Sequence, residues 1–446
     1  MEQRICNLVC FSCREGGIIP NRYSMQDVER YPKLHELREK LYHAAKAEPE
    51  RRFYTLKDRV YRNDVLRCSW ESVKSNKGSP GIDAQTIDNV IEYGEDIFLN
   101  ELAEDLRTEK YRAKDIKRKY IPKKNGKLRP LGIPIIRDRI VQGAVKLIIE
   151  PIFEADFQDF SYGYRTGKST QDARKEIQKF INYGCTNIYD ADIRGYFDNI
   201  DHGILMELIQ RRISDQYILK LIRAWLRAGI IEDDIRIEPE KGTPQGGVIS
   251  PLLANIYLNE MDRLWRKSGI EKREDVHLIR FCDDFVALSS KPFRNAITFI
   301  EAILGNLNLE LNTEKTRITT AKNGFDFLGF RFFRKYVHSH GKEKTYTRPT
   351  KQSVKSVKAK ITEITQRAVN GNIPETVQSL NLLMRGWSNY YRDINASKIL
   401  ASVQNYALNG LRKYLRKRHT KSGFGYKEYD NEYMKKIGIR TIQTRP

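Results

Sequence analysis

Two adjacent carboxylates, Asp283 and Asp284, stand at the expected turn of a β-hairpin over residues 277–289. Apolar residues with strand-forming character flank the pair on both sides. Two like charges held side by side repel and raise each other's pKa unless a cation neutralises them, so the pair favours a divalent-metal site. Asp192, at the end of an expected strand over 187–192, supplies the third carboxylate that two-metal phosphoryl or nucleotidyl transfer needs.

These carboxylates also have structural interpretations. An isolated Asp-Asp pair more often serves only to make a turn, which is a common role of Asp. Asp190 lies two residues before Asp192 and on the same side of the strand, so it competes for the place of the first ligand. The residues alone leave the choice between these two open.

The chain carries a large excess of positive charge, which indicates a polyanionic partner. Its 446 residues hold 79 Lys and Arg against 57 Asp and Glu, a formal net charge of +22. Residues 341–446 alone hold 22 Lys and Arg against 7 Asp and Glu, so most of the excess lies in the last quarter. Regional charge of this kind is typical of nucleic-acid binding, and the length suffices for two or three domains.

No segment has the pattern of a membrane anchor or an export signal. The sequence contains no run of 18 apolar residues, and its first residues lack a basic stretch followed by an apolar one. We therefore expect a cytoplasmic protein without a membrane partner. The spacing of Cys6, Cys10 and Cys13 resembles an iron–sulfur signature, but we favour reduced thiols; a zinc site completed by His35 or His43 is the other alternative.

Helical and strand patterns alternate through most of the chain, which predicts an α+β fold with an antiparallel sheet covered by helices. Asn125-Gly126 gives a strong turn signal inside a basic hairpin over 117–134. The other expected elements are helices over 34–47, 66–73, 95–108, 137–149 and 293–304, helices beginning at 169 and 202, and strands over 316–319 and 325–333.

The last part of the chain has a helical pattern instead. Apolar residues recur at alternating steps of three and four, which predicts two amphipathic helices, over 354–368 and 380–391. A third helix, over 408–417, is strongly basic. We expect the polar segment from Lys335 to Arg348 to link this helical domain to the preceding α+β part.

Eight blocks of the sequence, taken in order, resemble the reverse transcriptases encoded by group II introns, which are also called intron maturases. Each block alone is weak, but together they are highly specific, and the match runs from about Val65 to the C-terminus. The blocks are Gly78-Ser-Pro-Gly-Ile-Asp83, Ile121-Pro-Lys-Lys-Asn-Gly-Lys-Leu-Arg-Pro-Leu-Gly-Ile-Pro134, Tyr162-Gly-Tyr-Arg165, Asp192-Ile-Arg-Gly-Tyr-Phe-Asp-Asn-Ile-Asp-His202, Thr243-Pro-Gln-Gly-Gly-Val-Ile-Ser-Pro251, Phe281-Cys-Asp-Asp284, Leu311-Asn-Thr-Glu-Lys-Thr316 and Phe327-Leu-Gly-Phe330.

The resemblance implies the right-hand fold of polymerases, with fingers and palm built from an antiparallel sheet and helices, and an α-helical thumb. It places an N-terminal extension over 1–64, fingers over 65–180, a palm over 181–340 and a thumb or maturase domain over 349–446.

The resemblance also implies roles for the side chains at the centre of the palm. Asp192, Asp283 and Asp284 would hold two Mg²⁺ ions, with Mn²⁺ as an alternative. Asp192 is favoured over Asp190 because the family's first ligand lies five residues ahead of an aromatic ring. That ring, Phe197, resembles the steric gate that favours deoxynucleotides over ribonucleotides.

Four more matching residues would act on the incoming nucleotide. Lys123 and Arg129, on opposite arms of the expected hairpin, would clamp the triphosphate. Gln245 would pack near the sugar, and Lys315 would donate a proton to the pyrophosphate. The structural alternatives are a solvated basic hairpin for the first two, a surface position for Lys315 and core packing for Phe197.

Two further sets of residues would contact nucleic acid. The first resembles the primer grip and consists of Phe327, Leu328, Gly329 and Phe330. The second is a basic helix with Arg412, Lys413, Arg416, Lys417 and Arg418. Trp387, Tyr390 and Tyr391 would share that surface or form the core of the thumb.

Taken with the family, these residues imply an RNA-directed DNA polymerase that uses an RNA template, a DNA primer and deoxynucleoside triphosphates, and that binds group II intron RNA to assist splicing and mobility. The alternatives are a free-standing host reverse transcriptase used in antiviral defence, CRISPR spacer acquisition or DNA repair, and a splicing factor with a vestigial site. The sequence leaves open whether the chain forms a homodimer. Phe281 and Cys282 replace the family's usual Tyr and Ala, but the carboxylates are intact, so we expect an active polymerase.

Overall fold

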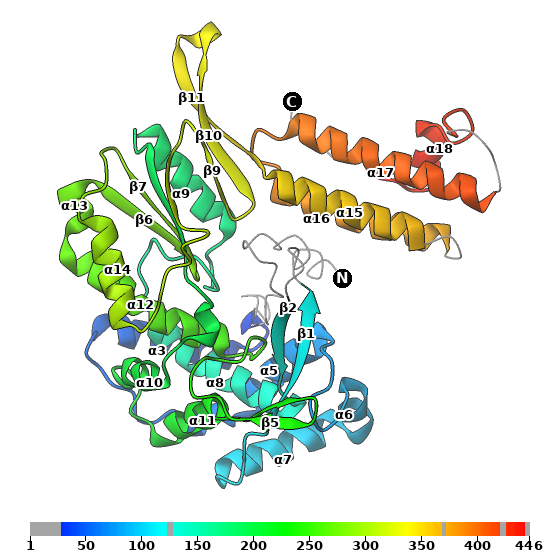
Figure 1. Cartoon of the computed structure of the whole chain (residues 1–446). Helices are drawn as coiled ribbons and strands as arrows, with labels where there is room; N and C mark the ends of the chain where they lie inside the picture. The colour runs from blue at the N-terminus through cyan, green and yellow to red at the C-terminus, as the bar shows by residue number, and fades with distance from the viewer. Residues whose placement is uncertain (1–27, 123–127, 368–371, 420–424, 442–446) are drawn as a thin grey trace. The chain divides into compact units, whose positions relative to one another are not determined.

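A computed structural model describes residues 28–122, 128–367, 372–419 and 425–441 (Figure 1). The chain divides into two compact units. The larger unit contains the described residues up to Phe180 and Asn187–Ile318, and the smaller unit contains Ile181–Thr186 and the described residues from Thr319 onward. Within the described ranges, none of the helices combines the length and apolar character that crossing a bilayer requires.

Helix α8 (Ile136–Glu154) is the most deeply buried helix of the larger unit, and all its residues from Asp138 to Phe153 are buried. A helix that is buried all round needs neighbours on every side. It continues past Pro151, where the sequence predicted its end, because Pro151 lies in the last turn and burial of Ile152 and Phe153 offsets the lost hydrogen bond. The other helices of this unit are α3 (Pro32–Ala47), α4 (Lys57–Val60), α5 (Asn63–Asn76), α6 (Ile87–Tyr93), α7 (Glu95–Arg107), α9 (Thr170–Asn182), α10 (His202–Gln210), α11 (Gln216–Leu226), α12 (Ser250–Ser268), α13 (Ile270–Glu274) and α14 (Ala296–Asn306).

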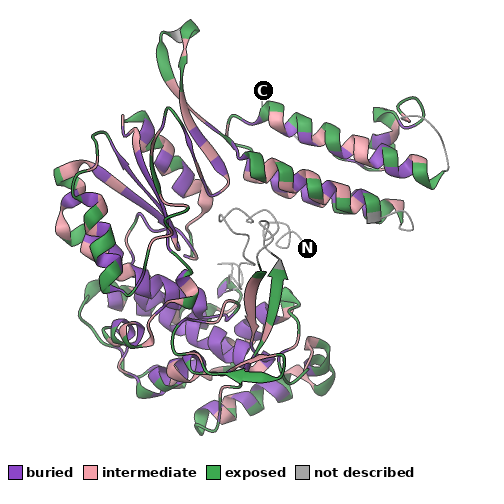
Figure 2. Cartoon of the chain, in the orientation of Figure 1, coloured by how far each residue is buried: buried purple, intermediate pink, exposed green. Residues whose placement is uncertain are grey.

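The predicted N-terminal helix is present as α3, and it packs into the core. Leu34 and Leu41 of α3 are buried, and Arg38 donates a hydrogen bond to Glu150 of α8 at 2.8 Å. Lys46 caps the same C-terminal end of α8 by donating to the carbonyl of Ala155 at 2.9 Å. Figure 2 shows how buried residues concentrate in α8 and the neighbouring helices.

A four-stranded sheet in the order β6-β7-β3-β8 carries the predicted carboxylate hairpin. Strand β7 is antiparallel to both β3 and β6, as predicted, and all six of its residues are buried, so both faces of the sheet are covered. The strands are β3 (Asn187–Asp192), β6 (Val276–Phe281), β7 (Asp284–Ser289) and β8 (Arg317–Thr320).

A second sheet of the larger unit contains the predicted basic hairpin. Strands β1 and β2 are antiparallel, β1 pairs in parallel with β4, and the order is β2-β1-β4-β5. The turn at Asn125-Gly126 lies outside the described residues. The strands are β1 (Ile116–Pro122), β2 (Leu128–Ile133), β4 (Ile230–Glu232) and β5 (Ile235–Ile237).

The smaller unit begins with the sheet β11-β10-β9, formed by β9 (Phe325–Phe327), β10 (Phe330–Val337) and β11 (Lys342–Pro349). The single strand predicted over 325–333 is therefore split by a turn at Leu328-Gly329, whose φ angles of 49° and 78° both lie in the left-handed region. The prediction of a linker from Lys335 to Arg348 is wrong, because these residues form most of the β10–β11 hairpin. Cations at alternate positions concealed its strand character.

The predicted C-terminal helices are all present in the smaller unit. They are α15 (Lys351–Arg367), α16 (Ile373–Tyr390) and α17 (Ser397–Arg418), followed by the short α18 (Asn431–Lys436). Gly410 of α17 lies close to α15, since a Cβ atom there would approach Thr365 to 3.3 Å. The helices predicted from the apolar spacing are therefore confirmed, and α15 packs against α17.

Candidate active site

Pairing of β3 with β7 brings the three predicted metal ligands to one end of the sheet. Asp192 is the cross-strand partner of Asp284, at the end of the ladder. The turn between β6 and β7 consists of Cys282 and Asp283 alone. Residues directly opposite on antiparallel strands have Cβ atoms about 5 Å apart, and like charges there destabilise the pair. The sheet therefore concentrates negative charge at this end.

The backbone of the turn has a demanding geometry. Cys282 has a φ of 61°, as the first residue of a type II′ turn requires. Gly163 packs directly on it, since a Cβ atom at Gly163 would lie 2.4 Å from the nitrogen of Cys282. Hydrogen bonds of 2.8 and 2.9 Å join residues Phe160 and Tyr162 to Arg280, so this segment runs beside β6 like a further strand.

A fully buried ion pair, which the sequence analysis missed, lies behind the turn. Neither Arg280 nor Asp262 has an exposed side chain, and Nε of Arg280 lies 2.9 and 3.0 Å from the two carboxylate oxygens of Asp262. Burial disfavours the charged form of Arg280, but the Asp262 carboxylate outweighs this effect and raises the pKa of the guanidinium. The Arg280 guanidinium therefore stays charged although it is fully buried.

Arg280 connects this ion pair to the turn. Its guanidinium donates to the carbonyl of Cys282 at 3.0 Å and to Oδ1 of Asn255 at 3.3 Å. Asn255 in turn donates to the carbonyl of Gly163 at 2.7 Å. One buried network thus fixes both the turn and the segment that packs on it. The signal that could have revealed it is an arginine inside an apolar strand, because such a charge needs a buried partner.

Electrostatics at the turn follow from its neighbours. Burial and the negative charge of Asp192 both raise the pKa of Asp283, while the positive charge of Arg129 on β2 lowers it. Arg129 is therefore within electrostatic reach of the carboxylates. Lys123, its predicted partner on the other arm of the hairpin, lies outside the described residues.

The donor set fits a divalent cation. Carboxylate oxygens are the ligands that hard cations such as Mg²⁺ prefer. A bound cation would also relieve the repulsion by which Asp192 raises the pKa of Asp283. Asp192, Asp283 and Asp284 are the residues that could hold it.

Asp192 has partners that support it over Asp190. Its Oδ2 atom accepts hydrogen bonds from Nζ of Lys315 at 3.0 Å and from Nδ2 of Asn312 at 3.2 Å, so Lys315 lies at the carboxylates. Asp190 lies further back on β3, fully buried, and its Oδ2 is 3.4 Å from Nε of Arg317. Asp192 is the one that pairs with Asp284, the residue next to the turn.

Phe197 and Gln245 are 48 positions apart, and the segments that carry them are joined by hydrogen bonds. Half-buried Phe197 belongs to the short 3-10 turn Tyr196–Asp198, and its carbonyl accepts a hydrogen bond from the nitrogen of Thr243 at 2.8 Å. Nε2 of Gln245 donates to the carboxylate of Asp198 at 3.2 Å. The loop that carries Gln245 is thereby docked on the turn that carries Phe197.

The same loop also contacts the strand that carries Arg129. The nitrogen of Gly132 on β2 donates to the carbonyl of Gln245 at 2.8 Å. Gly246 has a φ of 126°, and a Cβ atom there would lie 2.3 Å from the carbonyl oxygen of Gly132. Glycine is therefore required at position 246. The backbone contact between this loop and β2 links Gln245 to the strand that carries Arg129.

In the smaller unit, the predicted primer grip is the β9–β10 turn with its flanking residues, and two of the three predicted aromatic residues hold it. The hydroxyls of Tyr390 and Tyr391 donate to the carbonyls of Leu328 and Gly329 at 2.9 and 3.1 Å. The ring of Phe330 stacks on that of Tyr390, with centroids 5.0 Å apart. Trp387 and Tyr391 are buried, which agrees with the core alternative for these rings.

Most of the predicted basic helix is exposed, but Arg412 is not. Arg412 is buried, and it donates to the carbonyl of Tyr429 at 2.8 Å and to Asn431 at 2.7 Å. Its charge therefore holds the C-terminal segment against α17 and is turned away from the exposed face. Lys413, Lys417 and Arg418 are exposed and Arg416 is half-buried.

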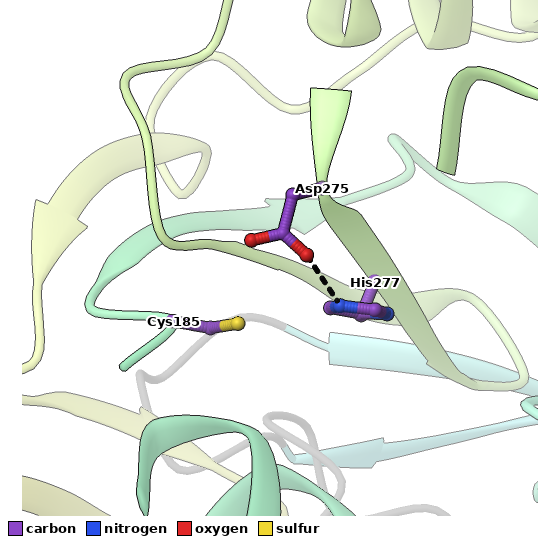
Figure 3. Close-up of side chains that lie close together, drawn as sticks. All are labelled: Cys185, Asp275 and His277. Carbon is purple, nitrogen blue, oxygen red and sulfur yellow. Dashed lines mark hydrogen bonds and ion pairs between the residues drawn. The ribbon is translucent and has the colours of Figure 1, made fainter. Parts of the chain in front are cut away.

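Another polar cluster lies at the opposite end of β6 from the turn. Nε2 of His277 lies 3.2 Å from Oδ1 of Asp275 (Figure 3). The ring of His277 stacks on Phe180 of α9 with centroids 4.0 Å apart, and Nδ1 of His277 lies 3.4 Å from Oε1 of Glu271. These contacts anchor the start of β6 and do not involve the carboxylates at its end.

Comparison with known proteins agrees with this geometry. Residues 121–332 match the family described as reverse transcriptase (RNA-dependent DNA polymerase), and residues 354–433 match the group II intron maturase-specific domain. Protein YkfC of Escherichia coli (strain K12) is 34% identical over 343 residues, which cover 68% of this chain and 89% of YkfC.

Other similar proteins are matched over smaller shares. The group II intron-encoded protein LtrA of Lactococcus lactis subsp. cremoris is 39% identical over 207 residues, which cover 46% of this chain and about a third (34%) of LtrA. A chain of a partial Cas6-RT-Cas1–Cas2 complex aligns over 56% of this chain and 42% of its own length, with 24% identity and a TM-score of 0.36. Given the two family matches and the extensive similarity to YkfC, this chain belongs to the group II intron-encoded reverse transcriptases that carry a maturase-specific domain.

Proposed function

We propose that this chain copies RNA into DNA by extending a DNA primer with deoxynucleoside triphosphates, and that it binds group II intron RNA to assist splicing and mobility. The observation that carries the polymerase part is the pairing of Asp192 with Asp284 beside Asp283. The maturase-specific match over 354–433 favours the intron role over a free-standing host enzyme. In this proposal residues 65–180 are fingers, 181–340 palm and 349–446 thumb.

Asp192, Asp283 and Asp284 would hold two Mg²⁺ ions, which when bound activate the primer 3′ hydroxyl and neutralise the triphosphate. The chain's own residues position the substrates. Arg129 binds the triphosphate by charge and by its planar donors. Lys315 would protonate the departing pyrophosphate, and its hydrogen bond of 3.0 Å to Asp192 supports this role.

Selection of the sugar rests on the Phe197 turn. The ring of Phe197 is half-buried, and its turn is fixed by the hydrogen bond to Thr243. A rigid ring cannot move away from a ribose 2′ hydroxyl, so it excludes ribonucleotides sterically. Gln245, which donates a hydrogen bond to Asp198 of the same turn, would contact the sugar as well.

Primer extension on an RNA template tests the polymerase part. Asp283→Asn should abolish extension while leaving the affinity for RNA unchanged, because it removes one negative charge without altering shape. Asp234→Asn is the matched control, since Asp234 is exposed in the β4–β5 turn and undergoes the same change. Extension by Asp283→Asn at the rate of the control would refute the assignment. Splicing of intron RNA tests the maturase part separately. The Asp283→Asn variant should still assist splicing.

A further inference from the structure

The β10–β11 hairpin has two different faces. Residues directly opposite on antiparallel strands share a face, and successive pairs alternate between faces. One face carries the pairs Arg331 with Arg348, Phe333 with Tyr346, Lys335 with Lys344 and Val337 with Lys342. We name these eight residues the basic face. It contains five cations and no carboxylate.

The opposite face is different in character. It carries Glu343, the hairpin's single carboxylate, which lies 3.4 Å from Nε of Arg334. Towards the base of the hairpin, this face is buried through Phe330 and Phe332. The opposite face thus packs and neutralises its own charge, while the outer part of the hairpin is exposed (Figure 2).

Charges on the basic face are arranged at an energetic cost. Lys335 lies directly opposite Lys344, and like charges in that position destabilise a strand pair. Among the described residues, no carboxylate forms an ion pair with Lys335, Lys342 or Lys344. Arg331 does have a partner, Asp326 at 3.1 Å. Repulsion within a folded hairpin is relieved when an external polyanion binds it.

The aromatic pair lies between these cationic pairs. The rings of Phe333 and Tyr346 stack with centroids 5.5 Å apart, and the guanidinium of Arg348 lies 5.2 Å from the centroid of Phe333. This packing stiffens the hairpin and holds Arg348 in a fixed place. An extended row of cations suits a sugar–phosphate backbone better than it suits a single small anion.

We propose that the basic face is an RNA-binding surface that contacts backbone phosphates independently of base sequence. The inference rests on the proposed function for its partner, RNA. It adds a surface that lies largely outside both family matches, which end at 332 and begin again at 354. The hairpin therefore extends the nucleic-acid contact beyond the basic helix α17.

The test is the salt dependence of RNA binding by a double variant, Lys335→Gln with Lys344→Gln. Each phosphate contact contributes about 0.7–0.9 to the slope of log affinity against log salt, so loss of two should lower the slope by about 1.4–1.8. Between about 50 and 200 mM salt, the unmodified chain should lose about 7–12-fold more affinity than the variant. The probe is a short single-stranded RNA of mixed sequence.

Lys267→Gln with Lys272→Gln is the matched control, because it removes the same charge from two exposed lysines of the larger unit. The control should keep the slope of the unmodified chain. A hairpin variant with that same slope overturns the proposal, and a partner other than RNA, such as an acidic protein, would give this result. Thermal unfolding shows that the variant is folded, since removing opposed lysines should not lower its midpoint.

Primer extension on a saturating template distinguishes this proposal from the proposed function. The hairpin variant should extend primers at the unmodified rate. If the unmodified chain does not extend primers but the salt slope changes as expected, the polymerase assignment fails and the RNA-binding surface stands. If extension is normal and the slope is unchanged, the surface fails alone.

Discussion

Replacement of Arg280 by Met tests whether the buried ion pair supports the catalytic turn. Arg280 and Asp262 have no exposed side-chain surface, so the substitution leaves the Asp262 carboxylate buried without its charge partner. Breaking a buried pair in this way costs about 3–5 kcal/mol. We therefore expect the free energy of unfolding of the larger unit to fall by that amount.

A second variant separates charge from positioning. Arg280→Met combined with Asp262→Val replaces the pair by apolar side chains, which is often close to neutral for stability. The carbonyl of Cys282 still lacks the donor that Arg280 provided at 3.0 Å, and an unsatisfied buried acceptor costs about 1–3 kcal/mol. The double variant should thus recover most of the lost stability but retain a less rigid turn.

Urea unfolding measures the stability of each variant. Primer extension over a Mg²⁺ titration measures how much Mg²⁺ the carboxylates at the turn require. The double variant should be folded yet need more Mg²⁺ for half-maximal extension, because Asp283 follows the residue that Arg280 holds. Arg266→Met is the control, since Arg266 forms an exposed pair with Asp159 and should lose only about 0–1 kcal/mol. If Arg280→Met were as stable as this control, or if the folded double variant had an unchanged Mg²⁺ requirement, the reasoning would be wrong.

Three further predictions concern other parts of the larger unit. Gly163→Ala should abolish primer extension without weakening RNA binding, because its Cβ would lie 2.4 Å from the nitrogen of Cys282; extension at the normal rate would contradict this. Phe197→Val should increase ribonucleotide incorporation in competition assays, and unchanged discrimination would reject the gate. Burial raises the pKa of Asp138 from 3.8 to about 6. Between these two values the folded chain holds a proton that the unfolded chain has lost. The free energy of unfolding should therefore fall as pH rises from about 4 to about 6. In urea unfolding at several pH values, Asp138→Asn should remove about 3 kcal/mol of that fall. The part due to Asp156 should remain, because burial also raises the pKa of Asp156 to about 6. Parallel pH curves for the variant and the unmodified chain would contradict this prediction.

Local patterns allowed much of the fold to be predicted from the sequence. Helices α7, α15 and α16 follow from apolar spacing, and the β6–β7 hairpin follows from apolar strands on both sides of Asp283 and Asp284. The juxtaposition of Asp192 with Asp284 could be expected only from the family resemblance, because strand pairing over 92 positions leaves no local signal. Docking of Gln245 on the Phe197 turn is of the same kind, since it depends on backbone hydrogen bonds between distant loops.

Two features that sequence reasoning missed involve charges in strands. In β6, Arg280 interrupts an apolar run, and its meaning depends on Asp262, which lies on a separate helix and is invisible to a pattern read along one strand. In β10 and β11, alternate Lys and Arg residues gave the appearance of a polar linker, although the same alternation is what a two-faced strand requires. A charge in a strand therefore has two opposite meanings: fully buried, as in Arg280, it must have an internal partner, while repeated on one exposed face it indicates that the partner is another molecule.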